Sequence, residues 1–404
     1  ANGWVSFSID GRFCYPSSGD VIDTGTKKVI AKIPAPGKAG NEKVLEIQER
    51  FTPPGGSCRN VLQTNGVLLD DRWGEFLKAR EFLVGVSLDG PPPLHDLHRV
   101  DHAGRPTSER ALRGLHILQR HGVPFNVLTT VHRGNGSHPR EVYRFFRGLG
   151  VEFMQFIPIV ERLEGVPLGG VPDRPPEELV SPRSVLPEQW GAFLNGVFDD
   201  WILRDVGRIF VQSFDQALAG FLGLEPALCV FRKHCGWGLA LEHNGDLYSC
   251  DHFVEPGYRL GNIHEQPIRE LAALPRQIAF GRAKEETLPG CCRNCRWLSS
   301  CNGGCPKNRF LAAPEGEGGL NVLCGGYRAF FGHAEPVMRA MAAEIRAGGT
   351  AASVMKRLTT TGRPEAARAA ARAGENAVPR NAPCPCGSGR KLKCCCGKRA
   401  VRGG

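Results

Sequence analysis

The spacing of the cysteines is the feature of this 404-residue sequence that most constrains its fold. Fourteen of the 16 cysteines lie between Cys229 and Cys396, and only Cys14 and Cys58 come earlier. Cysteine makes up about 4% of the chain, which is below the density of a disulfide scaffold. In a reducing cytoplasm, such clusters hold metals more often than disulfides. The sequence therefore predicts metal centres in its second half.

Eight of these cysteines have the number and spacing of two four-thiolate centres. The strongest run is Cys292-x2-Cys295-x5-Cys301-x3-Cys305, followed by Cys324 and preceded by Cys229, Cys235 and Cys250. Four sulfur ligands suit zinc or an iron–sulfur cluster, and spacing alone does not choose between them. The Asn244-Gly245 pair between Cys235 and Cys250 is a hairpin turn signal, so a hairpin is expected to bring distant sulfurs together.

The first half of the sequence has the pattern of βα units. Between residues 41 and 165, apolar strand-like runs alternate with helix-like stretches, which is typical of a parallel sheet. Strands are predicted at residues 60–64, 83–88, 125–131 and 153–159. Asp70 and Thr107 are predicted to cap two of the helices. After a proline- and glycine-rich loop at residues 163–187, a further helical region is predicted at residues 190–224.

The two flanking segments do not follow this pattern. In residues 1–40, apolar and polar residues alternate around turn signals, which predicts antiparallel hairpins. This segment resembles one blade of the YVTN-type β-propeller repeats, but a single blade cannot bury its own faces, so no propeller function follows. The alanine-rich helical stretch at residues 334–377 is predicted to be a tether with weak tertiary packing.

The cysteine-rich part resembles the SPASM domain of radical SAM enzymes. The pattern is Cys235-x9-Gly245-x4-Cys250, then the four-cysteine run, then Cys324 alone. Residues 63–66, 84–91, 95–101, 155–162 and 301–307 add a closer resemblance to the anaerobic sulfatase-maturating enzymes. The resemblance covers residues 41–332.

The resemblance implies an α/β fold with several parts. We expect a propeller-blade-like segment at residues 1–40, a partial radical SAM (β/α) barrel at 41–225 and a SPASM auxiliary iron–sulfur domain at 226–332. A helical linker at residues 333–377 and a small zinc motif at 378–404 would complete the chain.

The resemblance also implies two auxiliary [4Fe-4S] clusters. By position, the first would be held by Cys229, Cys235, Cys250 and Cys305. The second would be held by Cys292, Cys295, Cys301 and Cys324, which leaves Cys291 spare. The alternatives are zinc at these sites, or clusters that only staple a small loop-rich domain.

Four further residues match functional positions of the family. Asp251 follows Cys250 directly and would be the general base that takes the proton of the target side chain. Ser87 and Arg99 match positions that contact S-adenosylmethionine, where a guanidinium suits the methionine carboxylate, and Gln63 is a weaker match. The alternatives are an exposed turn aspartate, a serine that only ends a strand and an arginine paired with a surface acid.

The implied substrate is a sulfatase polypeptide, in which a cysteine or serine is oxidised to Cα-formylglycine. A 5′-deoxyadenosyl radical would take a β-hydrogen, Asp251 the heteroatom proton, and the auxiliary clusters the electron. The alternatives are a maturase of another peptide and a non-catalytic iron–sulfur and zinc protein that binds a partner.

One family motif is missing. Radical SAM enzymes bind their catalytic cluster through Cys-x3-Cys-x2-Cys, and no such run occurs in this sequence, nor does the Gly-Gly-Glu-Pro run after the second strand. The match to the family pattern begins near residue 41, where the propeller-like segment stands in place of the family's first strands. A truncated or rearranged gene, an authentic fusion and an error in sequence assembly are the competing explanations. We expect little or no radical chemistry from this polypeptide alone, and low stability of the open barrel.

Residues 381–396, within the segment 378–404, resemble the SEC-C motif, a small zinc module. The four sulfurs of Cys384, Cys386, Cys395 and Cys396 suit one tetrahedral Zn²⁺, with Cys394 as a competing ligand. The module implies docking to a protein partner and names no reaction, and the alternative is a disordered basic tail.

Charge and hydropathy exclude other classes. The net charge is +10, and residues 379–404 carry seven basic and no acidic side chains. The remaining chain is much closer to neutral, so nucleic acid is not expected as a partner. No apolar run reaches the length of a membrane span, and the amino end does not read as a secretory signal, so we expect a cytoplasmic protein without a membrane partner.

Overall fold

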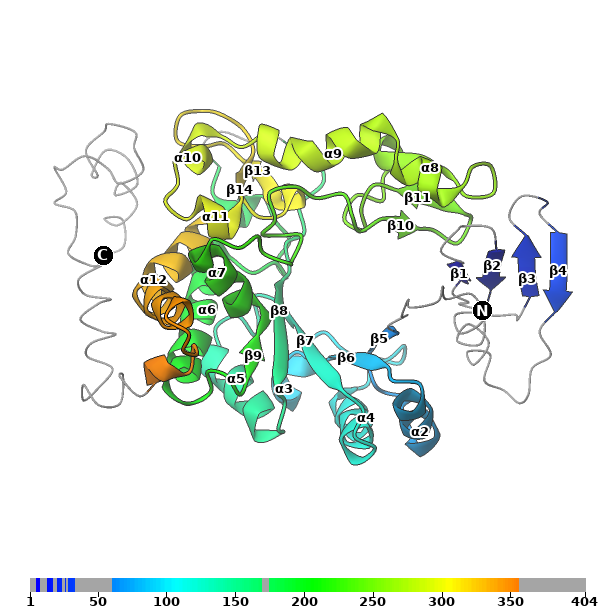
Figure 1. Cartoon of the computed structure of the whole chain (residues 1–404), viewed down its shortest axis with the longest axis horizontal. Helices are drawn as coiled ribbons and strands as arrows, with labels where there is room; N and C mark the ends of the chain where they lie inside the picture. Colours follow the sequence, from blue (N-terminus) through cyan, green and yellow to red (C-terminus); the bar gives the residue numbers. More distant parts are fainter. Residues whose placement is uncertain are drawn as a thin grey trace. The chain divides into compact units, whose positions relative to one another are not determined.

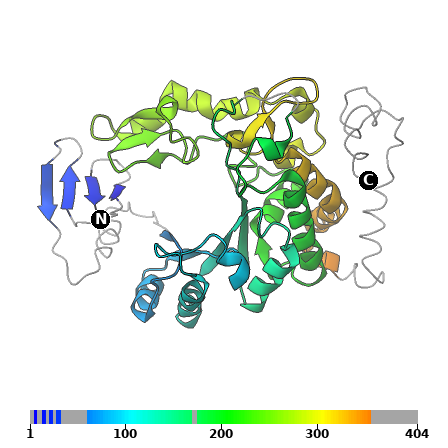
Figure 2. The same ribbon diagram turned by 180° about the vertical axis from the view of Figure 1, so that it is seen from behind.

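The computed structural model describes residues 60–168 and 174–355, together with Thr26 and four short strands near the amino end (Figures 1 and 2). The chain divides into two compact units. Unit 1 contains residues 1–60 and 234–286, and unit 2 contains residues 61–233 and 287–404. The zinc motif predicted at residues 378–404 and Cys58 lie outside the described residues.

The amino-terminal strands of unit 1 form an antiparallel meander. They are β1 (Val5–Phe7), β2 (Phe13–Pro16), β3 (Asp20–Asp23) and β4 (Lys28–Lys32), paired in chain order. The alternating pattern and the turn residues between the strands predicted this arrangement, and the pairing confirms it.

The second part of unit 1 is a three-stranded antiparallel sheet with two helices. It contains β10 (Ala240–Leu241), β11 (Asp246–Tyr248), η2 (Pro256–Tyr258), β12 (Arg259–Asn262), α8 (Ile268–Ala272) and α9 (Pro275–Glu286). Gly245, in the turn between β10 and β11, has a φ of +88°, which is the left-handed conformation expected of the Asn244-Gly245 turn. A small core of Leu247, Leu260, Ile263 and Leu271 holds the sheet to α8.

Unit 2 is built on a five-stranded parallel sheet in the order β5-β6-β7-β8-β9. The strands are β5 (Val61–Thr64), β6 (Leu83–Ser87), β7 (Phe125–Val131), β8 (Phe153–Pro158) and β9 (Phe210–Val211). The first four were predicted to within one residue at each end. Buried residues alternate along β7, so its two faces have different environments.

Helices connect these strands. They are α2 (Asp71–Ala79), α3 (Pro92–His95), α4 (Ser108–Arg120), α5 (Pro139–Gly148), η1 (Pro176–Glu178), α6 (Pro187–Arg204) and α7 (Gln212–Leu222). Asp70 caps α2 as predicted, because its carboxylate accepts a hydrogen bond from Trp73 N at 3.0 Å. The prediction for Thr107 is wrong, since its hydroxyl donates to the carbonyl of Arg99. The carboxylate of Asp96 caps α4 instead and accepts from the backbone N–H groups of Thr107 and Ser108.

The segment after residue 286 returns to unit 2. It contains α10 (Gly290–Arg293), α11 (Leu298–Cys301), η3 (Pro306–Asn308), β13 (Arg309–Leu311), β14 (Leu320–Asn321) and α12 (Cys324–Arg346). Figure 1 shows α12 lying along α6 and α7. The prediction of a weakly packed tether is therefore wrong as far as Arg346, because Met338, Met341 and other residues of α12 are buried in the core.

Two glycines allow α6 and α12 to approach closely. A Cβ at Gly326 of α12 would lie 2.3 Å from the carbonyl oxygen of Pro187, and one at Gly191 of α6 would lie 2.9 Å from the carbonyl oxygen of Gly326. Since α12 begins at Cys324, this contact also fixes the position of a predicted metal ligand.

Candidate active site

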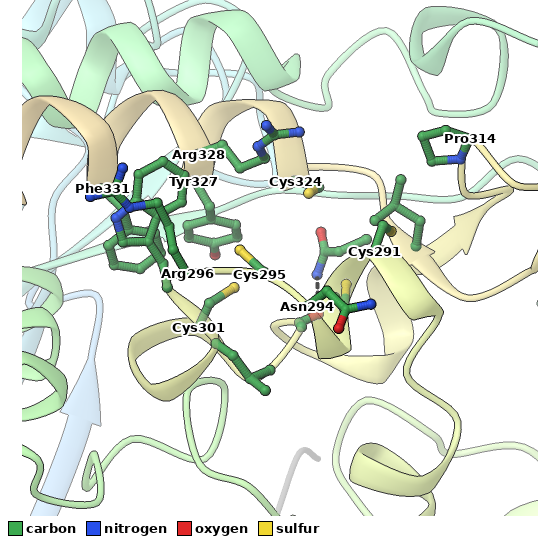
Figure 3. Close-up of a pocket in the computed structure, with 16 residues that line it drawn as sticks. Cys291, Asn294, Cys295, Arg296, Cys301, Pro314, Cys324, Tyr327, Arg328 and Phe331 are labelled. Atoms are coloured by element: carbon green, nitrogen blue, oxygen red, sulfur yellow. Dashed lines mark hydrogen bonds between the residues drawn. The ribbon is translucent and has the colours of Figure 1, made fainter. Parts of the chain in front are cut away.

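Five cysteine side chains line one cavity of about 230 Å³ in unit 2 (Figure 3). They belong to Cys291, Cys292, Cys295, Cys301 and Cys324. The last four are the ligands predicted for the second cluster, so residues separated by up to 32 positions in the sequence share one site. No disulfide involves the nine cysteines between Cys229 and Cys324, all of which are described.

Short helices position these thiols. Cys292 lies in α10, Cys301 ends α11 and Cys324 begins α12. Cys295 follows one turn after Cys292, because its N–H donates to the carbonyl of Cys292 at 3.0 Å.

The loop after Cys301 requires its two glycines. Gly303 and Gly304 have φ angles of +70° and +65°, and a Cβ at Gly303 would lie 2.4 Å from Leu288 Cδ2. The buried guanidinium of Arg309 donates to the carbonyls of Asn302 and Gly303, which fixes this loop from inside. Sequence reasoning missed Arg309, whose only signal was its position shortly after the four-cysteine run.

The cavity fits a multi-atom cluster better than a single ion. Four thiolates bind Zn²⁺ at about 2.3 Å, which leaves no open space between them. The space here is several times the roughly 30 Å³ that one water molecule occupies. Its wall includes the aromatic rings of Trp297, Tyr327 and Phe331, and the cations Arg296 and Arg328 suit the negative charge of a thiolate-ligated cluster.

Two thiols of this cavity have a raised pKa. Burial, followed by the neighbouring Cys301, raises the pKa of Cys324 to about 12. A hydrogen bond with the thiol of Cys292, followed by burial, raises the pKa of Cys291. Cluster binding must displace such protons, so we expect assembly to depend on pH.

The ligands predicted for the first cluster divide between the two units. Cys235 and Cys250 belong to unit 1, and Cys229 and Cys305 belong to unit 2. Within unit 1, the side-chain amide of Gln277 donates to the carbonyls of Gly236 and Ser249, at 2.7 and 3.1 Å. Because these carbonyls belong to the neighbours of Cys235 and Cys250, the buried Gln277 holds the two cysteine-bearing segments together. Sequence reasoning missed this residue, which carries no local signal.

Asp251 lies beside a predicted ligand. The thiol of Cys250 donates to Asp251 Oδ1 at 3.1 Å, and the carboxylate is exposed to solvent. The carboxylate of Asp251 is therefore accessible from solvent and adjacent to the Cys250 thiol.

Gln63 and Ser87 occupy the same face of the parallel sheet. Gln63 pairs with Gly85, and Ser87 lies two residues further along β6 on the same side of the strand. A Cβ at Gly85 would lie 2.6 Å from Leu128 Cδ1 and 3.7 Å from Gln63 Cγ, so a glycine here makes room for the Leu128 side chain on this face.

Arg99 takes part in a buried polar network. Its guanidinium donates to Asp89 Oδ1 and to Thr130 Oγ1, each at 3.0 Å, and Asp89 is only 2% exposed. Asn135 donates to the carbonyls of Asp89 and Thr130, which ties the ends of β6 and β7 together. Sequence reasoning singled out Arg99 but missed these partners, because they come from three separate segments.

Three family profiles match the sequence. The Radical SAM superfamily profile matches residues 33–146, the SPASM iron–sulfur cluster-binding domain matches residues 234–296, and the SEC-C motif matches residues 380–398. The chain is also 42% identical, over 321 residues, to a serine-type anaerobic sulfatase-maturating enzyme of Bacteroides thetaiotaomicron, with 78% of this chain and 77% of that enzyme covered. The chain belongs to the anaerobic sulfatase-maturating enzyme family.

Other sulfatase-maturating enzymes are similar at lower identity. The serine-type enzyme of Klebsiella aerogenes is 36% identical, with 72% of this chain and 67% of that enzyme covered. The cysteine-type enzyme of Clostridium perfringens strain 13 is 29% identical, with 76% and 80% covered. Among solved structures, native anSMEcpe with bound AdoMet and Cp18Cys peptide matches with a TM-score of 0.66 and 30% identity, over 75% of this chain and 81% of that chain.

These similarities confirm the sulfatase-maturating enzyme resemblance and the radical SAM and SPASM fold. Among the described residues, no helix has both the length and the apolar character that a membrane span requires.

Proposed function

We propose that this chain is a serine-type sulfatase maturase that holds the substrate, the auxiliary clusters and the general base, but lacks the ligands of the radical-generating cluster. The observation that carries the proposal is the 42% identity over 77% of a serine-type enzyme. The choice of serine rests on identities of 36–42% to serine-type enzymes, against 29–30% to cysteine-type enzymes.

The proposed reaction converts the seryl –CH2OH group of a sulfatase peptide into an aldehyde. The serine loses one β-hydrogen atom to a 5′-deoxyadenosyl radical, its hydroxyl proton to Asp251, and one electron to an auxiliary cluster. Cleavage of S-adenosylmethionine to methionine and this radical would take one electron from an external reductant through a radical SAM cluster, whose ligands these 404 residues do not supply. Asp251 suits the role of base because its exposed carboxylate lies beside Cys250.

The proposed metal ligands are those expected from the family. Cys292, Cys295, Cys301 and Cys324 would hold the second cluster, and their shared cavity supports this assignment. Cys229, Cys235, Cys250 and Cys305 would hold the first cluster, and the support within unit 1 is the bridge that Gln277 makes between two of the ligand-bearing segments.

The proposed S-adenosylmethionine site uses the face of the parallel sheet that carries Gln63 and Ser87. Gln63 and Ser87 share this face, at the carboxyl half of their strands, where parallel sheets bind ligands. Arg99 remains the candidate for the methionine carboxylate. Its bonds to Asp89 and Thr130 would preorganise the guanidinium for that contact.

The missing Cys-x3-Cys-x2-Cys run leads us to propose that these 404 residues alone do not cleave S-adenosylmethionine. A second candidate function, favoured by the SEC-C match at residues 380–398, is that of a non-catalytic iron–sulfur and zinc protein that binds a partner.

A graft separates the two candidates. Residues 1–40 are replaced by the segment of the Bacteroides relative that carries the three-cysteine motif, and both proteins are reconstituted anaerobically with dithionite, S-adenosylmethionine and a serine-containing sulfatase peptide. We expect no 5′-deoxyadenosine from the parent chain, but 5′-deoxyadenosine and formylglycine from the graft, both measured by mass spectrometry. The D251N variant of the graft should form 5′-deoxyadenosine with at least about tenfold less formylglycine. A graft that binds three clusters but forms no formylglycine would favour the non-catalytic function.

The carboxy-terminal motif is proposed to bind one Zn²⁺ through Cys384, Cys386, Cys395 and Cys396, and to dock a protein partner in the cytoplasm. The SEC-C profile match at residues 380–398 supports this proposal. Zinc analysis of the full chain against a variant with all four residues changed to serine tests the ligand set, with a loss of about one zinc expected.

A further inference from the structure

The cavity of the second cluster contains one thiol more than a [4Fe-4S] cluster needs. Cys291, which the family pattern leaves spare, lines the cavity together with the four proposed ligands. Figure 3 shows Cys291 on the same cavity as Cys295, Cys301 and Cys324.

The position of Cys291 is close to that of a ligand. Its thiol is hydrogen-bonded to the thiol of Cys292, so the two sulfurs are neighbours at one corner of the site. Cys291 lines the same cavity as Cys295, Cys301 and Cys324, so it faces the same space as these three proposed ligands.

The cavity that Cys291 lines also contains a cation. Arg328 belongs to the same wall and faces the space that the five thiols share. Cys292 is 8% exposed, whereas Cys291 is half-buried, so Cys291 is the outer thiol of the pair.

We propose that the second site is a five-thiol site in which Cys291 and Cys292 are alternative fourth ligands of the auxiliary cluster. Either thiolate completes the set formed by Cys295, Cys301 and Cys324. The site then retains its cluster when one of the two neighbours is lost or oxidised. The inference rests on the proposed function, because it requires that a cluster binds there.

The test uses the full chain, reconstituted anaerobically, with iron and acid-labile sulfide counted per chain. The variants are C291S, C292S and C291S/C292S. The matched control is C295S, which removes a proposed ligand that has no adjacent cysteine in the sequence. We expect about eight iron atoms in the parent and in both single variants of the pair, and about four in C291S/C292S and in C295S. Near-ultraviolet circular dichroism checks that each variant is folded.

Electron paramagnetic resonance of the reduced proteins gives a second readout. The signal of the second cluster should persist in C292S with altered g values, because a different cysteine conformer binds the iron, and it should be lost in the double variant. If C292S loses as much iron as C291S/C292S, Cys291 is not a ligand and the inference is overturned while the proposed function stands. An iron-free parent chain would overturn both.

Discussion

Gly281 of α9 lies against the backbone of Cys235 so closely that a side chain has no room. A Cβ at Gly281 would lie 2.5 Å from the carbonyl oxygen of Cys235, and the N–H of Cys235 donates to the carbonyl of Gly281 at 3.2 Å. The helix therefore serves as the support on which a proposed ligand of the first cluster is held.

Changing Gly281 to alanine should push this backbone away. We expect the free energy of unfolding to fall by about 1–3 kcal/mol, as overpacking typically causes, and the iron content to fall because Cys235 is displaced. Urea unfolding followed by circular dichroism measures the first effect. The control is G257A in the same unit, because a Cβ at Gly257 meets no atom within 4 Å. Equal stability of the two variants would contradict the close contact.

The adjacent glycines at the start of α12 offer a matched pair. A Cβ at Gly326 would lie 2.3 Å from Pro187 O, whereas a Cβ at Gly325 would meet Pro187 Cβ at an ordinary 3.7 Å. We expect G326A to lose about 1–3 kcal/mol of stability by separating α6 from α12, and also part of the second cluster through displacement of Cys324. G325A should be unchanged or more stable by up to about 1 kcal/mol, since alanine favours helix. The account of α12 fails if the two variants have the same unfolding midpoint and iron content.

Much of the fold could be predicted from local sequence patterns. The predictions that were wrong concern contacts between residues that are distant in the sequence. The Asn244-Gly245 turn and the strands of unit 2 were predictable because alternation and turn chemistry are local signals. Threonine is a residue type that often caps helices, and Thr107 precedes α4. The helix is capped instead by the carboxylate of Asp96, eleven residues earlier, which accepts the hydrogen bond from Thr107 N–H. The packing of α12 depends on a glycine contact with α6 that no pattern within α12 reveals.

The residues of the candidate site also include some that the sequence predicted and some that it did not. Ligand spacing predicted four of the five cysteines that line the second cavity, because the family motif records their positions. Arg309 and Gln277 support these segments by donating to backbone carbonyls. Such contacts depend on where a carbonyl points after folding, which a single sequence does not reveal.

Asp215 of α7 should make stability depend on pH. Burial raises the pKa of its carboxyl from 3.8 to about 6. The folded state therefore keeps its proton while the unfolded state loses it, so this residue's contribution falls as the pH rises from about 4 to about 6 and is constant above. D215N should be more stable than the parent by about 1–3 kcal/mol at pH 8, with little difference at pH 4. A difference that does not change between urea unfolding curves at the two pH values would contradict the raised pKa.

The central claim is that the thiols between Cys229 and Cys324 hold two iron–sulfur clusters, and Mössbauer spectroscopy of the chain reconstituted with ⁵⁷Fe tests it most directly. The account predicts about eight iron atoms per chain, all with the parameters of [4Fe-4S] clusters. A chain that remains colourless and iron-free, or that binds only zinc at these cysteines, would contradict it.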